Sequence, residues 1–338
     1  MKYVLIGGVG SAILLYGLSM IYGASQSTFY EVIQVNLANP EIINLELLIL
    51  GLIFFFAGIG FKLSAVPFHM WAPDVYEGSP TPITAYLSVA PKAAGFALMI
   101  RFFNQVFVNG DSLSGLGWYA DVSFAWPQLL AVISVITMTM GNLVAIQQKS
   151  VKRMLAYSSI AHAGYMLMVF PTVSSEGVFA VMIYLVMYLF MNLGAFFVLI
   201  YVAQKEGGEN FEHFRGLGWR MPIVGIVMTV FMFSLTGLPP TVGFIGKFYL
   251  FVAVINAGSA FYWIAFFAAI NTVVSLYYYM RVVKTMYLDG GPSEVILAPP
   301  FSMTVILLAL AIPSIFFGIY WTPILNWVKD SLLFFVQI

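Results

Sequence analysis

Long apolar segments alternate with short polar ones along the whole chain, and this pattern predicts a bundle of membrane-spanning helices. A helix that crosses a bilayer needs about 20 mostly apolar residues. The expected fold class is therefore an all-α integral membrane protein with about nine transmembrane helices. The nine candidate spans are 3–23, 44–66, 82–103, 126–147, 154–171, 178–203, 222–257, 260–284 and 301–321.

The seventh candidate span, 222–257, is too long for one plain helix and contains the sequence GLPP at 237–240. Two adjacent prolines remove two backbone donors and interrupt a helix. Inside a membrane, an interruption is tolerated only where protein or water satisfies the freed backbone groups. The segment therefore predicts either a simple kink or a broken helix, and a broken helix would mark a functional position.

The two ends of the chain predict different kinds of helix, a membrane span at the N-terminal end and an interfacial helix at the C-terminal end. The first 23 residues are apolar and show no obvious small-residue cleavage site, so they are interpreted as a span and not as a signal peptide. Segment 322–338 carries Trp327 and Lys329 among apolar residues, which is typical of a helix lying along the membrane interface.

Composition agrees with a membrane protein and excludes several function classes. Of the residues, 61% are hydrophobic and only 8% are charged, whereas soluble domains carry roughly 25% charged residues. Net charge is zero, so no basic face suggests nucleic acid. The chain has no cysteine, which excludes thiolate-held iron–sulfur clusters and zinc. It also lacks a nucleotide-binding motif, so any redox chemistry belongs to another chain.

Positive charge predicts the orientation of the spans, because cytoplasmic loops carry an excess of Lys and Arg. Segments 24–43, 104–125 and 172–177, which follow odd-numbered spans, have neither residue. The pattern puts residue 1 in the cytoplasm and the C-terminus outside. The basic residues that decide it are Lys2, Lys149, Lys152, Arg153, Lys205, Arg215, Arg220, Arg281 and Lys284.

Three lysines fall inside candidate spans: Lys62 late in the second, Lys92 in the middle of the third, and Lys247 in the second half of the seventh. A charge at bilayer depth costs at least ~2.5–3.5 kcal/mol. Burial disfavours the charged form of an amine, so a buried lysine can release its proton and act as a relay. The alternative is that each lysine snorkels to an interface.

Three histidines, His69, His162 and His213, are too scattered to suggest a metal site. His162 lies in LAYSSIAHAGYMLM, where it is either a packed, hydrogen-bonded residue or a bridge between lysines. The neighbouring side chains at 157–159 could hold water. His69 follows a proline in what could be a short break after Lys62 and is interpreted as structural. His213 is interpreted as solvated.

Asp74 and Glu77 lie in a loop rich in proline and glycine, MWAPDVYEGSPTP. The simplest interpretation is a solvated turn on the cytoplasmic side. A contact with a partner or a site of proton uptake is the alternative.

Three long stretches of the sequence are distinctive: GIGFKLSAVPFHMWAPDVYEGSPTP, VKRMLAYSSIAHAGYMLM and GLPPTVGFIGKFYLF. They resemble the antiporter-like subunits of complex I (NADH:quinone oxidoreductase) and the related multisubunit cation/proton antiporters. VVSLYYYMRVVKTMY adds to the likeness, which is strongest to the subunit N branch of this family. The resemblance covers essentially the whole chain, and its motifs are long and specific.

The resemblance implies a fold with two five-helix repeats of inverted topology, each containing one broken helix. Residues 3–103 would be the last three helices of the first repeat, 126–285 a complete second repeat, and 301–338 a C-terminal helix and tail. The four residues that match the family's proton relay are Lys62, Lys92, His162 and Lys247.

The chain begins at MKYVLIGG, which resembles a point internal to family members. Bacterial members have five further helices before it, and the fifth carries a glutamate that pairs with the broken-helix lysine. We therefore expect a start codon placed too late, with a real truncation as the alternative. In either case Lys62 would lack that anion within this sequence.

The resulting prediction is a non-redox, proton-translocating subunit driven by quinone reduction in other subunits. No cofactor is expected in this chain; NADH, flavin, iron–sulfur clusters and quinone are expected in partner subunits. The expected partners are other membrane subunits of complex I, further antiporter-like ones included, in a bacterial cell membrane. Rival predictions are a subunit of a cation/proton antiporter and a structural scaffold whose lysines are merely buried.

Overall fold

A computed structural model describes residues 1–37, 44–107, 126–172, 174–290 and 298–336, and in these ranges its regular structure is helical apart from one isolated β-bridge. The helices are α1 Lys2–Ser25, α2 Tyr30–Leu37, α3 Leu45–Leu63, α4 Trp71–Gly78, α5 Thr81–Phe107, α6 Trp126–Ile146, α7 Val151–Leu167, α8 Ser175–Glu206, α9 Leu217–Arg220, α10 Pro222–Thr236, α11 Val242–Asn256, α12 Tyr262–Tyr287, α13 Phe301–Ile319 and α14 Thr322–Val336, with 3-10 turns η1 Phe170–Thr172, η2 Phe211–Phe214 and η3 Ser259–Phe261.

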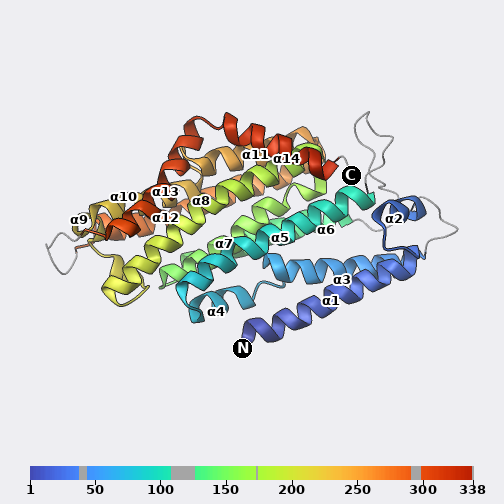
Figure 1. The fold of residues 1–338 in the computed structure, drawn as a ribbon, viewed down its shortest axis with the longest axis horizontal. Helices are drawn as coiled ribbons and strands as arrows, with labels where there is room; N and C mark the ends of the chain where they lie inside the picture. The colour runs from blue at the N-terminus through green and yellow to red at the C-terminus, as the bar shows by residue number, and fades with distance from the viewer. Residues whose placement is uncertain (38–43, 108–125, 173, 291–297, 337–338) are drawn as a thin grey trace.

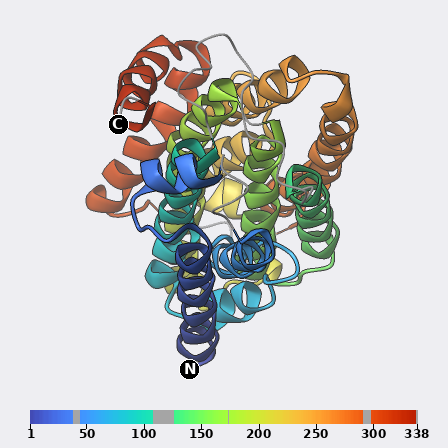
Figure 2. The same cartoon turned by 90° about the vertical axis from the view of Figure 1, so that its right-hand side faces the viewer.

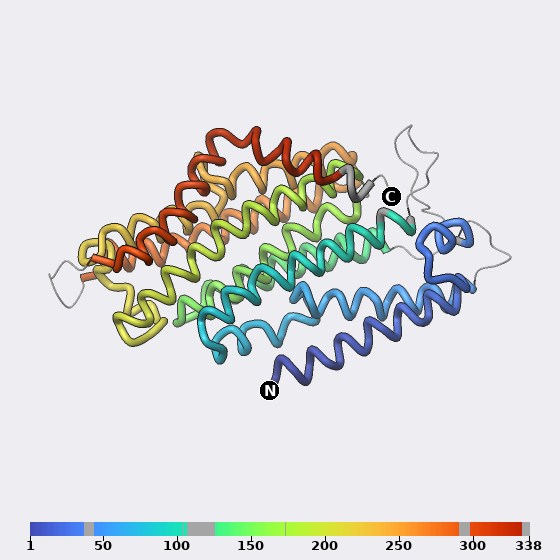
Figure 3. Tube along the Cα trace, in the orientation of Figure 1, coloured from blue at the N-terminus to red at the C-terminus, as the bar shows by residue number. Residues whose placement is uncertain are grey.

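The long helices lie side by side and form an elongated bundle (Figure 1). The short helices α4 and α9 lie at one end of the bundle and α2 at the other. Figure 2 shows the bundle turned by 90°, with α1 at its lower edge. The trace in Figure 3 shows α13 turning sharply into α14, which lies on the side of the bundle opposite α1.

Seven helices in the described part of the chain are long and apolar enough to cross a membrane, or eight if one bent pair counts as a single span. These seven correspond to the first, second, third, fourth, sixth, eighth and ninth predicted spans. A helical form is required because no water is present in the bilayer core to satisfy backbone N–H and C=O groups. The prediction of an all-α membrane protein is therefore confirmed.

The predicted fifth span, 154–171, is represented by α7, which has 17 residues and is shorter than a typical bilayer span. Fifteen of its 17 residues are buried inside the bundle. The neighbouring helices shield α7 from lipid, so α7 is suited to carry polar side chains.

The segment 322–338, predicted to lie along an interface, corresponds to α14. Its residues Ile324 and Val328 belong to an apolar cluster with side chains of α8 and α11. Residues 337–338 are outside the described part.

The predicted interruption in 222–257 is confirmed, because α10 ends at Thr236 and α11 begins at Val242. Gly237 adopts a positive φ of 90°, which a glycine tolerates without steric cost. The Ser234 hydroxyl accepts a hydrogen bond of 3.1 Å from the N–H of Gly243. Protein thus satisfies this freed N–H group, which is what a break inside a membrane requires.

The break expected after Lys62 is also present, between α3 and α4. Ser64 takes a left-handed conformation at the end of α3, with φ 59°. The N–H of Val66 donates to the Thr137 hydroxyl of α6 at 3.0 Å. The indole N–H of Trp71 donates to the carbonyl of Phe61 at 3.0 Å, so the start of α4 is fixed to the end of α3.

Glycines allow two helix pairs to approach closely. A Cβ at Gly17 of α1 would lie 2.5 Å from the backbone N of Phe55 in α3, and a Cβ at Gly164 of α7 would lie 2.5 Å from that of Met138 in α6. Small residues at such contacts let backbones touch, which is how helices associate in lipid.

Candidate functional site

Lys92 lies in the interior of α5, directly after Pro91, and is 1% exposed. Its ammonium donates hydrogen bonds to the carbonyl and the hydroxyl of Ser159 on α7. The Ser159 hydroxyl is also 3.4 Å from the Tyr76 hydroxyl of α4. Lys92 therefore does not reach the surface, and the snorkelling alternative fails for it.

Lys247 lies on α11, shortly after the second break, and is 4% exposed. Its ammonium donates a 2.8 Å hydrogen bond to the carbonyl of Thr236, the last residue of α10. The same ammonium lies 4.6 Å from the centre of the Tyr165 ring of α7, a cation–π distance. The broken helix thus supplies a free carbonyl, and Lys247 uses it instead of reaching for the surface.

His162 lies on α7 between these two contacts and is 1% exposed. Its Nδ1 is 2.6 Å from the Tyr184 hydroxyl of α8, and its Nε2 is 3.0 Å from the Tyr279 hydroxyl of α12. The Tyr279 hydroxyl is in turn 2.5 Å from that of Ser158. His162 is therefore a packed and hydrogen-bonded residue, and both its ring nitrogens face hydroxyl groups that can exchange protons with them.

One helix connects the three residues. Three residues of α7 make the contacts. Ser159 bonds Lys92, His162 bonds Tyr184 and Tyr279, and Tyr165 contacts Lys247. With a rise of about 1.5 Å per residue, Ser159 and Tyr165 are about 9 Å apart along the axis. The structure therefore brings Lys92, His162 and Lys247 onto one polar line through an otherwise apolar core.

Lys62 is placed differently. It lies in the last turn of α3, is half-buried, and has its ammonium 6.0 Å from the centre of the Phe61 ring. Among the residues that the structure describes, its ammonium has no hydrogen-bond partner. Its Cβ lies 3.7 Å from where a Cβ on Gly95 would be, so it faces α5 about one turn from Lys92. No printed contact joins it to the other three residues.

Tyrosines complete the polar line, and sequence reasoning did not single them out. Tyr76, Tyr184, Tyr188 and Tyr279 come from three different helices and are 0% exposed. The signal available in the sequence was an excess of tyrosine within apolar spans, as in VVSLYYYMRVV. A single sequence does not tell which tyrosines point inward, because tyrosine is equally common at membrane interfaces.

Ion pairs gather at the end of the bundle where α4 lies. Arg153 pairs with Asp74 at 3.1 Å and with Glu77, and Lys2 pairs with Asp74. The hydrogen bond from Lys2 lowers the pKa of the Asp74 carboxyl, and the charge of Arg153 adds to this effect. Asp74 and Glu77 are therefore not merely a solvated turn, since they hold α4 to α1 and α7.

Lys152 makes a second connection at this end. Its side chain is 4% exposed, lies 3.1 Å from the Glu209 carboxylate and donates a 2.8 Å hydrogen bond to the carbonyl of Ser79. Glu209 also accepts a hydrogen bond from the Thr81 hydroxyl of α5. Lys152 has a structural role in addition to the topological one expected from its charge. The His213 ring accepts a 3.3 Å hydrogen bond from the N–H of Asn210, as part of the cap of η2.

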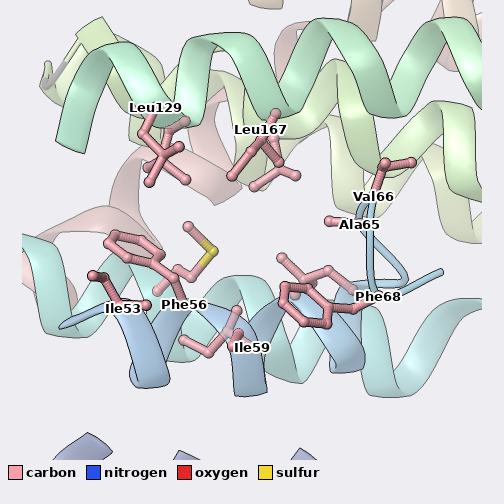
Figure 4. A pocket seen from close by; sticks show the side chains of 14 residues that line it. Ile53, Phe56, Ile59, Ala65, Val66, Phe68, Leu129 and Leu167 are labelled. Carbon is pink, nitrogen blue, oxygen red and sulfur yellow. The ribbon is translucent and has the colours of Figure 1, made fainter. Parts of the chain in front are cut away.

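A cavity of about 150 Å³ lies beside the first break, between α3, α5 and α6 (Figure 4). Phe56 and Ile59 of α3 face Leu129 of α6 and Leu167 of α7 across it, and Phe68 closes it near the break. All its lining side chains are apolar. This cavity is therefore chemically unlike the polar line along α7.

The chain is thus an integral membrane protein, a helical bundle with buried lysines, a histidine and tyrosines on one line in its interior. Comparison with known proteins gives the family: residues 1–275 match the family described as NADH:quinone oxidoreductase/Mrp antiporter, transmembrane. The chain belongs to that family, as the resemblance in its sequence indicated.

Three relatives illustrate the match. The chain is 50% identical to NADH-quinone oxidoreductase subunit N 2 of Sorangium cellulosum, over 98% of this chain and 65% of the relative. It is 32% identical to a chain of respiratory complex I from Thermus thermophilus, with a TM-score of 0.76 over 96% of this chain and 67% of that one. It is 30% identical to a chain of the membrane-bound sulfane sulfur reductase, an archaeal respiratory membrane complex, with a TM-score of 0.85 over 99% and 65%. The chain thus spans about two thirds of the length of these relatives.

Proposed function

We propose that this chain is a proton-translocating membrane subunit of an NADH:quinone oxidoreductase. One observation carries the proposal: two fully buried lysines, Lys92 and Lys247, contact the same buried helix, and His162 lies between their contact points on it. The similarity to proteins named NADH-quinone oxidoreductase subunit N supplies the reaction in which such a path would be used.

The proposed path begins at the end of the bundle where α4 and α9 lie. A proton reaches Lys62 or Lys92, crosses by His162 and its tyrosines, and leaves by Lys247. Amines and imidazole suit this task because each can hold a proton and release it, whereas a guanidinium cannot. Moving one charge against 100 mV costs about 2.3 kcal/mol, and this is the work that quinone reduction in partner subunits must supply.

The helices would be arranged as the family's repeats. In this proposal residues 3–103 are the last three helices of the first repeat, 126–285 are the second repeat of inverted topology, and α7 and the pair α10–α11 complete a set of nine spans. The two interrupted helices support it, since each repeat would contain one.

The proposed location is a bacterial cell membrane, with residue 1 in the cytoplasm and the C-terminus outside. The gathering of Lys2, Lys152 and Arg153 around α4 supports this orientation, because cytoplasmic ends carry the positive charge. The proposed partners are the other membrane subunits of the complex, and the proposed cofactors, flavin, iron–sulfur clusters and quinone, are held by partner subunits.

The test uses Lys92→Ala and Lys247→Ala in the assembled complex, reconstituted in vesicles. Proton uptake per NADH oxidised should fall in both variants, because each removes a titratable group from the path. Lys205→Ala is the matched control, since Lys205 is an exposed lysine at the end of α8. Normal proton movement per NADH in both path variants would refute the proposal.

A cation/proton antiporter subunit is the second candidate, because the family model includes the Mrp antiporters. The subunits that co-purify with the chain distinguish the two. Iron–sulfur and flavin subunits would support the oxidoreductase, and other small membrane subunits would support the antiporter.

A further inference from the structure

The polar line along α7 contains an interval between Lys92 and His162 that no described hydrogen bond crosses. Lys92 is bonded to Ser159, and His162 is bonded to Tyr184 and Tyr279. Within the described residues, no hydrogen bond leads from the Ser159 hydroxyl to the imidazole, although only three residues separate them. A proton moving between them needs another group in this interval.

Tyr188 of α8 lies in this interval. It is 0% exposed, and its ring centre is 5.1 Å from that of His162. Its hydroxyl lies close enough to the Ser159 hydroxyl to interact with it, but the geometry is too poor for a full hydrogen bond. A buried hydroxyl without a partner costs about 1–3 kcal/mol, so such a group is expected to be satisfied by something else.

Asn192 lies one helical turn further along α8 and has the same property. It is 0% exposed, and its amide nitrogen donates a 2.6 Å hydrogen bond to the Ser88 hydroxyl of α5. Its Oδ1 has no partner among the described residues. Ser88 is one turn before Lys92, so this second unpaired atom also lies near the lysine.

We propose that Tyr188 and Asn192 bind a water molecule that connects Lys92 and Ser159 to His162, and that Tyr188 is a further residue of the proton path. The two unpaired atoms are complementary to water, because the amide oxygen accepts a hydrogen bond and the hydroxyl both donates and accepts. Buried water is stable where it finds two to four polar partners.

The transfer along this link conserves atoms and charge. The Lys92 ammonium gives a proton to the bridging water, and the water gives one of its protons to the Tyr188 hydroxyl. The Tyr188 hydroxyl gives its own proton to the Tyr279 hydroxyl, which passes its proton to Nε2 of His162. Lys92 ends as a neutral amine and His162 as an imidazolium. Each oxygen ends with the number of protons it had at the start. The inference rests on the proposed function, since it assigns a residue to the path proposed there.

The experiment compares Tyr188→Phe with Tyr201→Phe in the assembled complex. Tyr201 is a matched control because it lies on the same helix, is 3% exposed and also has a buried hydroxyl without a described partner. It is 13 residues away, about 20 Å along the axis. Protons moved per NADH are measured at equal complex content, so a loss of folding or assembly does not mimic the effect.

Tyr188→Phe should lower protons moved per NADH by an amount comparable to Lys92→Ala, and Tyr201→Phe should leave the ratio unchanged. Equal ratios for Tyr188→Phe and the parent, with a low ratio for Lys92→Ala, would overturn this inference and leave the proposed function intact. Normal ratios for Lys92→Ala as well would instead refute the proposed function.

A second measurement does not depend on activity. An experimental structure of the complex should show water density within hydrogen-bond distance of both the Tyr188 hydroxyl and Asn192 Oδ1, and Asn192→Leu should remove it. A map that resolves neighbouring buried waters but has none here would overturn the inference.

Discussion

The chain interrupts two helices, one between α3 and α4 and the other between α10 and α11, and both interruptions follow the same backbone plan. Each upstream helix ends in a left-handed residue, Ser64 in the first and Gly237 in the second. A proline in a cis peptide bond follows each, Pro67 and Pro240. A left-handed cap followed by proline is a common way to end a helix, because proline cannot continue it.

The two breaks differ in how they are held. At the second, Lys247 is buried and bonded to the Thr236 carbonyl, so the lysine is itself part of the break. At the first, Lys62 is half-buried and has no such bond among the described residues, while ion pairs of Asp74 and Arg153 hold α4 from outside. Two helix breaks with the same backbone conformation are therefore stabilised differently, the second by a buried hydrogen bond and the first by ion pairs at the surface.

The largest expected effect is at Gly243, in the first turn of α11. A Cβ there would lie 1.6 Å from the Ser234 carbonyl oxygen, a backbone atom that cannot move aside. Gly243→Ala should therefore destabilise the second break by at least about 3 kcal/mol, the upper end for overpacking. The yield and melting temperature of the assembled complex measure this.

Gly60→Ala is the matched change at the first break. Its Cβ would lie 2.9 Å from the ring of Phe68, which is 40% exposed and can turn away. We expect nearly normal yield. Equal damage from both changes would show that the two breaks are packed alike.

A smaller difference is expected when the lysines are replaced by methionine. Lys247→Met leaves the buried Thr236 carbonyl unpaired and should cost about 1–3 kcal/mol of stability in addition to any loss of pumping. Lys62→Met removes no hydrogen bond described in the structure and should leave stability unchanged. Thermal unfolding of the purified complex tests this, and an equal loss of stability would contradict the contrast between the breaks.

The smallest effect concerns the ion pairs of α4. The pKa of Asp74 is lowered in the folded protein, so its attraction to Lys2 and Arg153 is present at neutral pH and is lost as pH falls through that lowered pKa. These groups are partly exposed, so Asp74→Asn should cost no more than about 1 kcal/mol.

Hydrogen exchange of α4 measures this effect. Exchange should quicken in the variant, and in the parent at low pH or high salt, but not in α11. Glu212→Gln, at an exposed acid in η2, is the control. Unchanged α4 exchange in Asp74→Asn would show that the ion pairs do not hold this helix.

Much of this organisation could be predicted from the sequence. Apolar runs predict the helices because a bilayer permits few other forms, and the GLPP sequence predicts the second break because proline lacks a donor. The burial of Lys92 and Lys247 follows from their central position in apolar spans. The burial of α7 inside the bundle could not be predicted, because an apolar segment looks the same whether lipid or protein surrounds it.

The partners of the buried lysines could not be predicted. Ser159 is 67 residues from Lys92, and Thr236 offers its backbone and not its side chain. Side-chain type carries no information about which carbonyl a broken helix leaves free. The same holds for Tyr184 and Tyr279, whose inward direction depends on how α8 and α12 rotate against α7.

The apolar cavity beside the first break offers water almost no hydrogen-bond partners, and this affects where charge can move in the bundle. Its 14 lining side chains offer hydrocarbon and one thioether, so a water molecule inside would find few partners and the space should stay dry. Hydrocarbon does not stabilise a bare charge, so a dry space beside the proposed proton path would act as an electrical insulator. In that proposal, it would prevent H⁺ from leaving the bundle sideways at the break between α3 and α4 and so from dissipating the membrane potential.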